Sequence, residues 1–115
     1  MLLRVDHESS LSLHEQIAGG LRAAIASGEL QPGERLPPAR QLAEGLDVNV
    51  HTLLRATQTL RDEGLLEIRR GRGTAVTGVA PKLAAVGELA QRLVNEARRG
   101  GLDDREIVRL VEAQL

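Results

Sequence analysis

Residues 28–76 read GELQPGERLPPARQLAEGLDVNVHTLLRATQTLRDEGLLEIRRGRGTAV, and this stretch decides the fold. A proline pair followed by apolar residues at helical spacing predicts a short helix over residues 39–45. Asp47 then falls at a tight corner. Asn49 is a favourable N-cap for a second helix, which the apolar spacing predicts to run to Glu63. The pattern is typical of two helices joined by a tight turn.

A hairpin is predicted directly after the second helix. Residues 65–69 and 74–77 have the length and composition of two short strands. The tip between them consists of Arg70, Gly71, Arg72 and Gly73. Glycine permits the positive φ that a tight hairpin turn requires. Helix, turn, helix and hairpin in this order predict a winged helix-turn-helix, an α+β fold in which the hairpin is the wing.

One further helix is expected before this stretch. Apolar residues at helical spacing predict it over residues 13–27, and residues 1–6 are interpreted as a short edge strand. Gly19 and Gly20 fall inside the helix, where each costs about 1 kcal/mol relative to alanine. Either another backbone approaches closely there, or the helix is only marginally stable; the sequence leaves both open.

The segment after the hairpin is predicted to be a dimerisation tail. We expect a winged domain over residues 1–77, a linker over residues 78–81 and two helices within residues 82–115. The apolar stripe of these helices consists of Leu83, Val86, Ala90, Leu93, Val94, Ala97, Ile107, Leu110 and Val111. Two helices alone cannot hide such a stripe, so the same surface of a second copy is expected to cover it in a two-fold homodimer. The alternative is that the tail folds back on its own head domain.

Composition limits the possible functions. A chain of 115 residues is the size of one small domain, and it has no Phe, Tyr, Trp or Cys. The core must therefore be aliphatic, and disulfides and thiolate metal sites are excluded. Without aromatic rings for base stacking, single-stranded nucleic acid is a poor candidate ligand. The net charge of -1 argues against a generic polyanion binder, so any nucleic-acid binding must depend on local charge.

No catalytic or cofactor site is recognisable. The serines stand in no nucleophile motif, and His7 and His14 lack a second ligand at metal spacing. We therefore expect neither an enzyme nor a metal or cofactor. With no signal peptide and no membrane span in the sequence, a cytoplasmic protein is expected.

Residues 13–76 resemble the DNA-binding domain of the GntR family of bacterial regulators. The resemblance is carried by LHEQI, SGELQPGERLP, ARQLAEGLDV, NVHTLLRA and DEGLLEIRRGRGTAV. NVHTLLRA and the short two-helix tail resemble the YtrA subfamily in particular, whose small C-terminal region pairs subunits and which lacks a large effector domain. The resemblance implies a sequence-specific regulator of transcription, expected to be a repressor that binds a two-fold operator in double-stranded DNA as a homodimer.

The second helix of such a fold lies in the major groove, and its first turn carries candidate DNA contacts. These are Asn49, Val50, His51 and Thr52, with Arg55 one turn further along. The free N–H groups and the dipole at a helix N-terminus favour a phosphate. Val50 is a candidate contact for a thymine methyl group.

Arg40 and the wing complete the expected interface. The resemblance aligns Arg40 with the family arginine that reads a base, and a bidentate contact to guanine is worth roughly 1–3 kcal/mol. The wing tip, residues 70–73, is expected to enter a minor groove or to straddle its phosphates. Val50 and Leu54 stand at positions that are arginine in some other branches, and whether Leu54 belongs to the core or faces DNA stays open.

A different class of function stays open at this point. A winged-helix domain also serves as a protein-interaction module that does not read DNA. The sequence identifies neither an operator nor the regulated genes, and no residue indicates a pocket for a small-molecule effector. It also does not distinguish repression from activation.

Overall fold

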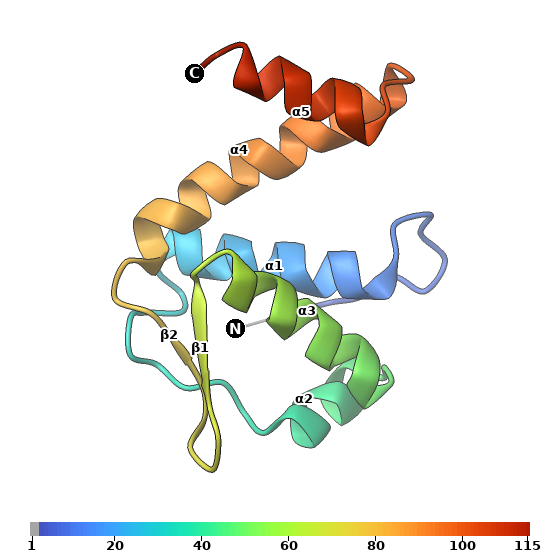
Figure 1. Cartoon of the computed structure of the whole chain (residues 1–115). Coiled ribbons are helices and arrows are strands. Elements are labelled where there is room, and N and C mark those ends of the chain that lie inside the picture. The colour runs from blue at the N-terminus through green and yellow to red at the C-terminus, as the bar shows by residue number, and fades with distance from the viewer. Residues whose placement is uncertain (1–2) are drawn as a thin grey trace.

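The computed structural model describes residues 3–115, with Pro81 described through its backbone alone. The elements, in chain order, are α1 (Leu13–Ser27), α2 (Ala39–Leu46), α3 (Val50–Asp62), β1 (Leu66–Arg69), β2 (Gly73–Val76), α4 (Ala80–Arg99) and α5 (Asp104–Glu112). In Figure 1, α2, α3 and the β1–β2 hairpin lie on one side of α1, and α4 and α5 lie on the other. The predicted winged helix-turn-helix with a two-helix tail is confirmed.

The core is aliphatic and is centred on α1 and α3. Its largest fully buried side chains are Ile17, Leu21, Ile25, Leu53, Leu60 and Leu65. The predicted inward stripe of α3 is confirmed, because Leu53, Ala56, Thr57 and Leu60 are all at most 6% exposed. Burial of this stripe against α1 fixes the rotation of α3 and turns its opposite face to solvent.

The hairpin is antiparallel, with Leu66 opposite Val76 and Arg69 opposite Gly73. At its tip the N–H of Arg72 donates to the carbonyl of Arg69 (3.0 Å), and Gly71 has a φ of 77°. A positive φ at the third position of a four-residue turn is the requirement of a type II turn, which glycine meets without strain. The predicted glycine turn is therefore present.

The segment between α1 and α2 pairs with the wing. Arg35 forms an antiparallel bridge with Ala75. The N–H of Gly33 donates to the carbonyl of Val76 (2.8 Å), and the N–H of Leu36 donates to the carbonyl of Thr74 (2.9 Å). The chain that leads into α2 is thus attached along β2, which couples the wing to the helix-turn-helix.

The predicted edge strand at the N-terminus is wrong within the described residues. Residues 3–6 form no strand; the side chain of Leu3 instead lies against Gly20, where an added Cβ would collide with it. The close neighbour of Gly20 is thus a side chain, and no second backbone among the described residues approaches it. None of the described residues approaches Gly19 within 4 Å of an added Cβ. Met1 and Leu2 lie outside the described residues.

The first turns of α4 belong to the core of the winged domain. α4 begins at Ala80, inside the segment expected as a linker, and Ala80 and Ala84 are both 0% exposed. α4 packs along α1, so the N-terminal end of α4 is anchored on the same chain. The division of the chain into a head, a linker and a dimerisation region remains a prediction.

Arg22 and Glu63 form an ion pair beneath α4. The guanidinium donates to both carboxylate oxygens, at 2.9 and 2.6 Å, and its side chain is only 5% exposed. A Cβ added at Gly87 would lie 3.0 Å from Glu63 Oε1 and 3.2 Å from Arg22 Cδ. The absence of a side chain at Gly87 therefore lets α4 cover a pair that links α1 to the end of α3.

Candidate nucleic-acid interface

The N-terminal end of α3 is held by its cap. The N–H of His51 donates to the side-chain oxygen of Asn49 (2.8 Å), as the sequence predicted. Asn49 and His51 are exposed, whereas Thr52 is half-buried. Because the cap uses only the oxygen of the Asn49 amide, its NH2 group stays available as a donor to a ligand.

The outward face of α3 carries both apolar and cationic groups. Leu54 is 44% exposed, so it is not a core residue, and Arg55 beside it is exposed. Val50 was expected to point outward, but it is half-buried and packs against the core. The packing leaves Val50 less surface for a thymine methyl group than the exposed Leu54 has.

The corner between α2 and α3 is made by Asp47, which has a φ of 56°. Aspartate tolerates this left-handed conformation better than most residues. The N–H of Val48 closes the corner by donating to the carbonyl of Ala43 (3.0 Å). Arg40 is exposed in the first turn of α2. This turn directly follows the segment whose Arg35 pairs with Ala75 of β2.

The wing tip extends into solvent, and all four of its residues, Arg70, Gly71, Arg72 and Gly73, are exposed. In Figure 1 the hairpin tip and α2 lie at the same end of the molecule, and α5 lies at the opposite end. The start of α3 follows α2 through the Asp47 corner. The elements that carry the predicted DNA-binding residues thus lie on one side of the molecule.

Ion pairing divides the arginines into two groups. The paired ones are Arg22 with Glu63, Arg61 with Asp62, Arg69 with Glu67, Arg98 with Asp104 and Arg99 with Glu96. None of the ion pairs found within residues 3–115 includes Arg40, Arg55, Arg70 or Arg72, and all four are exposed. Arg92, Arg105 and Arg109 of α4 and α5 are also exposed and outside these ion pairs, so the four are distinguished by their position around the start of α3 and the wing on a chain whose net charge is -1.

The expected dimer stripe is only partly free in the single chain. Leu83, Val86, Ala90, Leu110 and Val111 are exposed, while Leu93 and Val94 are half-buried. Leu89 and Val108, which sequence reasoning missed, are 60% and 54% exposed and extend the same faces.

Two expected interface residues are already covered within one chain. Ala97 and Ile107 are 8% and 7% exposed, because α5 turns back over the end of α4 there (Figure 1). The N–H of Leu102 closes this corner by donating to the carbonyl of Ala97 (3.0 Å). These two residues fix the angle between α4 and α5 and leave little surface for a partner.

Residues 13–76 match the family model described as bacterial regulatory proteins, gntR family. The match spans more than half of the chain and ends with β2. The chain belongs to the GntR family. It is a DNA-binding transcriptional regulator and not an enzyme, as the sequence predicted.

Relatives and solved structures of the GntR family agree with this assignment. The HTH-type transcriptional repressor YtrA of Bacillus subtilis is 31% identical over 108 residues, which are 89% of this chain and 83% of the repressor. The structure of YtrA from Sulfolobus acidocaldarius, a GntR-family transcription factor, is 33% identical with a TM-score of 0.63, over 80% of this chain and 99% of that chain. The predicted resemblance to YtrA is confirmed.

A second similar structure holds DNA. The DNA-binding domain of AraR in complex with the operator ORE1 is 27% identical with a TM-score of 0.57, over 64% of this chain and 89% of that chain. The predicted alternative, a winged-helix module that does not read DNA, is not supported for this member of the GntR family. None of its described helices combines the length and apolar character needed to cross a bilayer.

Sequence reasoning missed Arg35 on the interface side of this GntR-family chain. Its exposed side chain adjoins the wing because its backbone pairs with Ala75, and no ion pair within residues 3–115 includes it. The sequence signal was weak, since Glu34, Arg35 and Leu36 alternate in polarity over too few residues to indicate a strand.

Proposed function

We propose that this GntR-family regulator is a sequence-specific repressor that binds a two-fold DNA operator as a homodimer. The observation that carries the proposal is the gathering of four exposed arginines, Arg40, Arg55, Arg70 and Arg72, around the start of α3 and the wing, none of which is in an ion pair within residues 3–115. Phosphate contacts by such groups supply much of the affinity of a protein for duplex DNA. Because its proposed ligand is chromosomal DNA, we assign the protein to the cytoplasm.

Each element has a proposed role at the duplex. α3 enters the major groove, where His51 and Thr52 contact the backbone and Arg55 reaches a phosphate or a guanine edge. Asn49 caps the helix and donates its free amide group. Leu54, with its exposed side chain, offers the apolar contact to a thymine methyl that was first expected of Val50.

Arg40 and the wing contact the flanks of the site. We assign a base contact to Arg40, whose guanidinium has the bidentate geometry that reads guanine. The wing residues Arg70 and Arg72 grip the adjacent minor groove or its phosphates, while Gly71 and Gly73 keep the tip narrow. In each subunit, α3 would therefore contact the base pairs of the major groove, and the arginines of the wing would contact the phosphates beside it.

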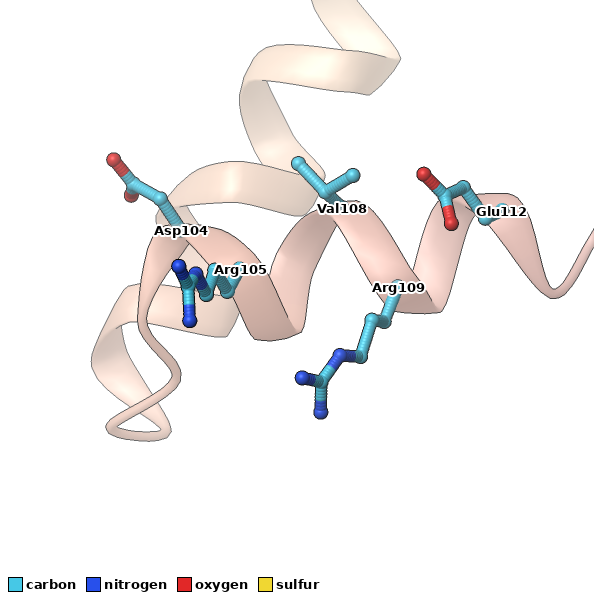
Figure 2. Close-up of a pocket in the computed structure, with 5 residues that line it drawn as sticks. All are labelled: Asp104, Arg105, Val108, Arg109 and Glu112. Atoms are coloured by element: carbon cyan, nitrogen blue, oxygen red, sulfur yellow. The ribbon is translucent and has the colours of Figure 1, made fainter.

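The proposed dimer interface lies on α4 and α5. Val86 is 64% exposed and Leu89 60% exposed on α4, and Val108 is 54% exposed on α5. Figure 2 shows Val108 on one edge of α5 between Asp104 and Glu112, with Arg105 and Arg109 along the neighbouring side. These charges border the apolar face and supply the polar rim that protein interfaces require.

We propose that a second copy of the chain covers these apolar faces of α4 and α5, because a two-fold axis lets each tail bury the apolar stripe of the other. Size-exclusion chromatography with light scattering tests this arrangement. We expect a dimer at micromolar concentration, a monomer for Val86→Asp, and a dimer for the control Gln41→Asp, whose exposed position is on α2, at the opposite end of the molecule from α5. A monomeric wild-type protein would contradict the proposed dimer.

Selection of bound duplexes from a random pool tests DNA reading. We expect enrichment of two inverted half-sites whose centres lie roughly 10–10.5 base pairs, or a multiple of this spacing, apart. Failure to enrich any duplex, together with binding that is insensitive to salt, would overturn the proposal. Repression is supported by the B. subtilis relative, which is a repressor. In vitro transcription from a promoter that contains the selected site should fall as protein is added.

A further inference from the structure

We propose that Arg35 and Arg72 together clamp one backbone phosphate of the bound duplex. The inference rests on the proposed function and adds a residue that the sequence did not single out. Arg35 belongs to neither helix of the helix-turn-helix and does not belong to the hairpin tip. It reaches the proposed interface through its pairing with the wing.

The two arginines line a hollow of about 530 Å³ between the wing and the segment that leads into α2. Arg35, Pro37 and Pro38 line it from one side, and Arg72 and Thr74 line it from the other. Guanidinium groups and a hydroxyl are hydrogen-bond donors, and none of the residues that line the hollow carries a carboxylate. The lining therefore suits an anion.

The position of Arg35 is fixed by its backbone. Its bridge to Ala75 is flanked by the N–H of Val76, which donates to the carbonyl of Glu34 (2.9 Å), and by the bond from Leu36 to Thr74. Arg35 is thus held against the same strand that carries the wing tip. A wing that moves onto DNA would carry Arg35 with it.

Among the described residues, no carboxylate forms an ion pair with the arginines of the hollow, Arg35 and Arg72. Glu67 lines a smaller adjoining hollow with both arginines, but its carboxylate is already engaged by Arg69 at 2.9 Å. Two guanidinium groups that face one cavity repel each other until an anion enters between them.

The location of the hollow favours a DNA phosphate. It lies between the wing tip and the first turn of α2, the two proposed flanking contacts, so a strand that touches both passes over it. A single phosphate can accept donors from two guanidinium groups, a geometry that arginine suits better than lysine. Free inorganic phosphate has the same donor requirements, so the test must separate the two sources.

The test measures the affinity of the full-length protein for its selected duplex as a function of salt. Each phosphate contact contributes about 0.9 to the slope of log K against log salt. Arg35→Gln should therefore reduce the magnitude of that slope by about 0.9 for each protomer, with equal weakening on every sequence bound. Arg35→Lys should keep the slope close to that of the wild type. The control Arg92→Gln, which removes an exposed charge on α4, should leave it unchanged.

Ethylation interference on the duplex then locates the contact. We expect one phosphate per half-site whose ethylation weakens the wild type but no longer weakens Arg35→Gln or Arg72→Gln. If the wild type binds with a steep salt dependence and Arg35→Gln keeps the same slope, the clamp is wrong while the regulator proposal stands. If the wild type binds no duplex, both are wrong. Millimolar inorganic phosphate that competes more strongly than chloride at equal ionic strength would identify a free-anion site and overturn the DNA assignment.

Discussion

Replacing Glu63 by alanine should destabilise the protein more than replacing Arg22 by methionine. The pair is bidentate, but the two side chains differ in burial: Arg22 is 5% exposed and Glu63 is 30% exposed. Loss of Glu63 leaves the buried guanidinium of Arg22 beneath α4 without a counter-charge. Loss of Arg22 leaves a carboxylate that can turn to water, while methionine keeps the apolar packing of the arginine stem.

The magnitudes follow from this asymmetry. Removing one partner of a buried pair costs about 3–5 kcal/mol, and the partial exposure of Glu63 favours the lower end, about 3 kcal/mol for Glu63→Ala. For Arg22→Met we expect about 1 kcal/mol, the usual net value of a hydrogen bond to a group that water can reach. The double variant should resemble Arg22→Met alone, because no charge then remains buried.

Urea denaturation followed by far-ultraviolet circular dichroism measures these free energies of unfolding. The chain has no Trp or Tyr, so intrinsic fluorescence gives no signal. All variants must be compared at one protein concentration because a dimer is stabilised by mass action. As a control, Arg61→Met removes an exposed pair and should change the free energy of unfolding by less than about 0.5 kcal/mol. Equal losses for Glu63→Ala and Arg22→Met, or a larger loss for Arg22→Met, would refute the reasoning.

Three further predictions concern the proposed interface. Asn49→Ala should lower the free energy of unfolding by about 1 kcal/mol through loss of the cap and should weaken operator binding; unchanged urea midpoints would contradict the capping role. Gly71→Ala, at a φ of 77°, should strain the wing by about 1 kcal/mol and weaken binding while the helical signal is kept, and unaltered affinity would show that the wing is not involved. Arg40→Ala should lose about 1–3 kcal/mol of discrimination at one base pair, whereas Arg70→Ala should weaken binding to all duplexes evenly. Affinities for single-base variants of the selected site measure both effects. If the two protein variants lose affinity in the same way across these duplexes, their separate roles are disproved.

The helix-turn-helix and the wing were predictable because their signals are local. The cap at Asn49, the apolar stripe of α3 and the glycines of the hairpin each act within a few residues, and the structure has all of them. The same local signals positioned the candidate DNA-binding residues. Once the rotation of α3 is set by its buried stripe, the exposure of Leu54 and Arg55 follows.

Features that depend on distant residues were not predictable. Arg22 and Glu63 are 41 positions apart, and nothing in either local sequence indicates their contact. The pairing of Arg35 with Ala75 likewise joins a proline-flanked turn to a strand far along the chain. Pairing of this kind is decided by tertiary packing and not by propensity.

The tail was predicted correctly as two helices, but the role of each apolar residue was not. Periodicity marks every apolar residue on a helix face and cannot tell which are covered by the same chain. Ala97 and Ile107 are buried at the α4–α5 corner, whereas Leu89 and Val108 are free. Periodicity likewise did not show that α4 begins inside the expected linker. Ala80 and Ala84, in the first turns of α4, are buried in the core of the chain.

Backbone amide NMR during titration with the selected duplex tests the central claim most directly, because it reports which surface meets DNA. We expect chemical-shift changes to concentrate at Arg40, at residues 49–55 and at the wing tip, residues 70–73, with little change in α5. Changes confined to α4 and α5, with residues 49–55 and the wing unaffected, would contradict this claim.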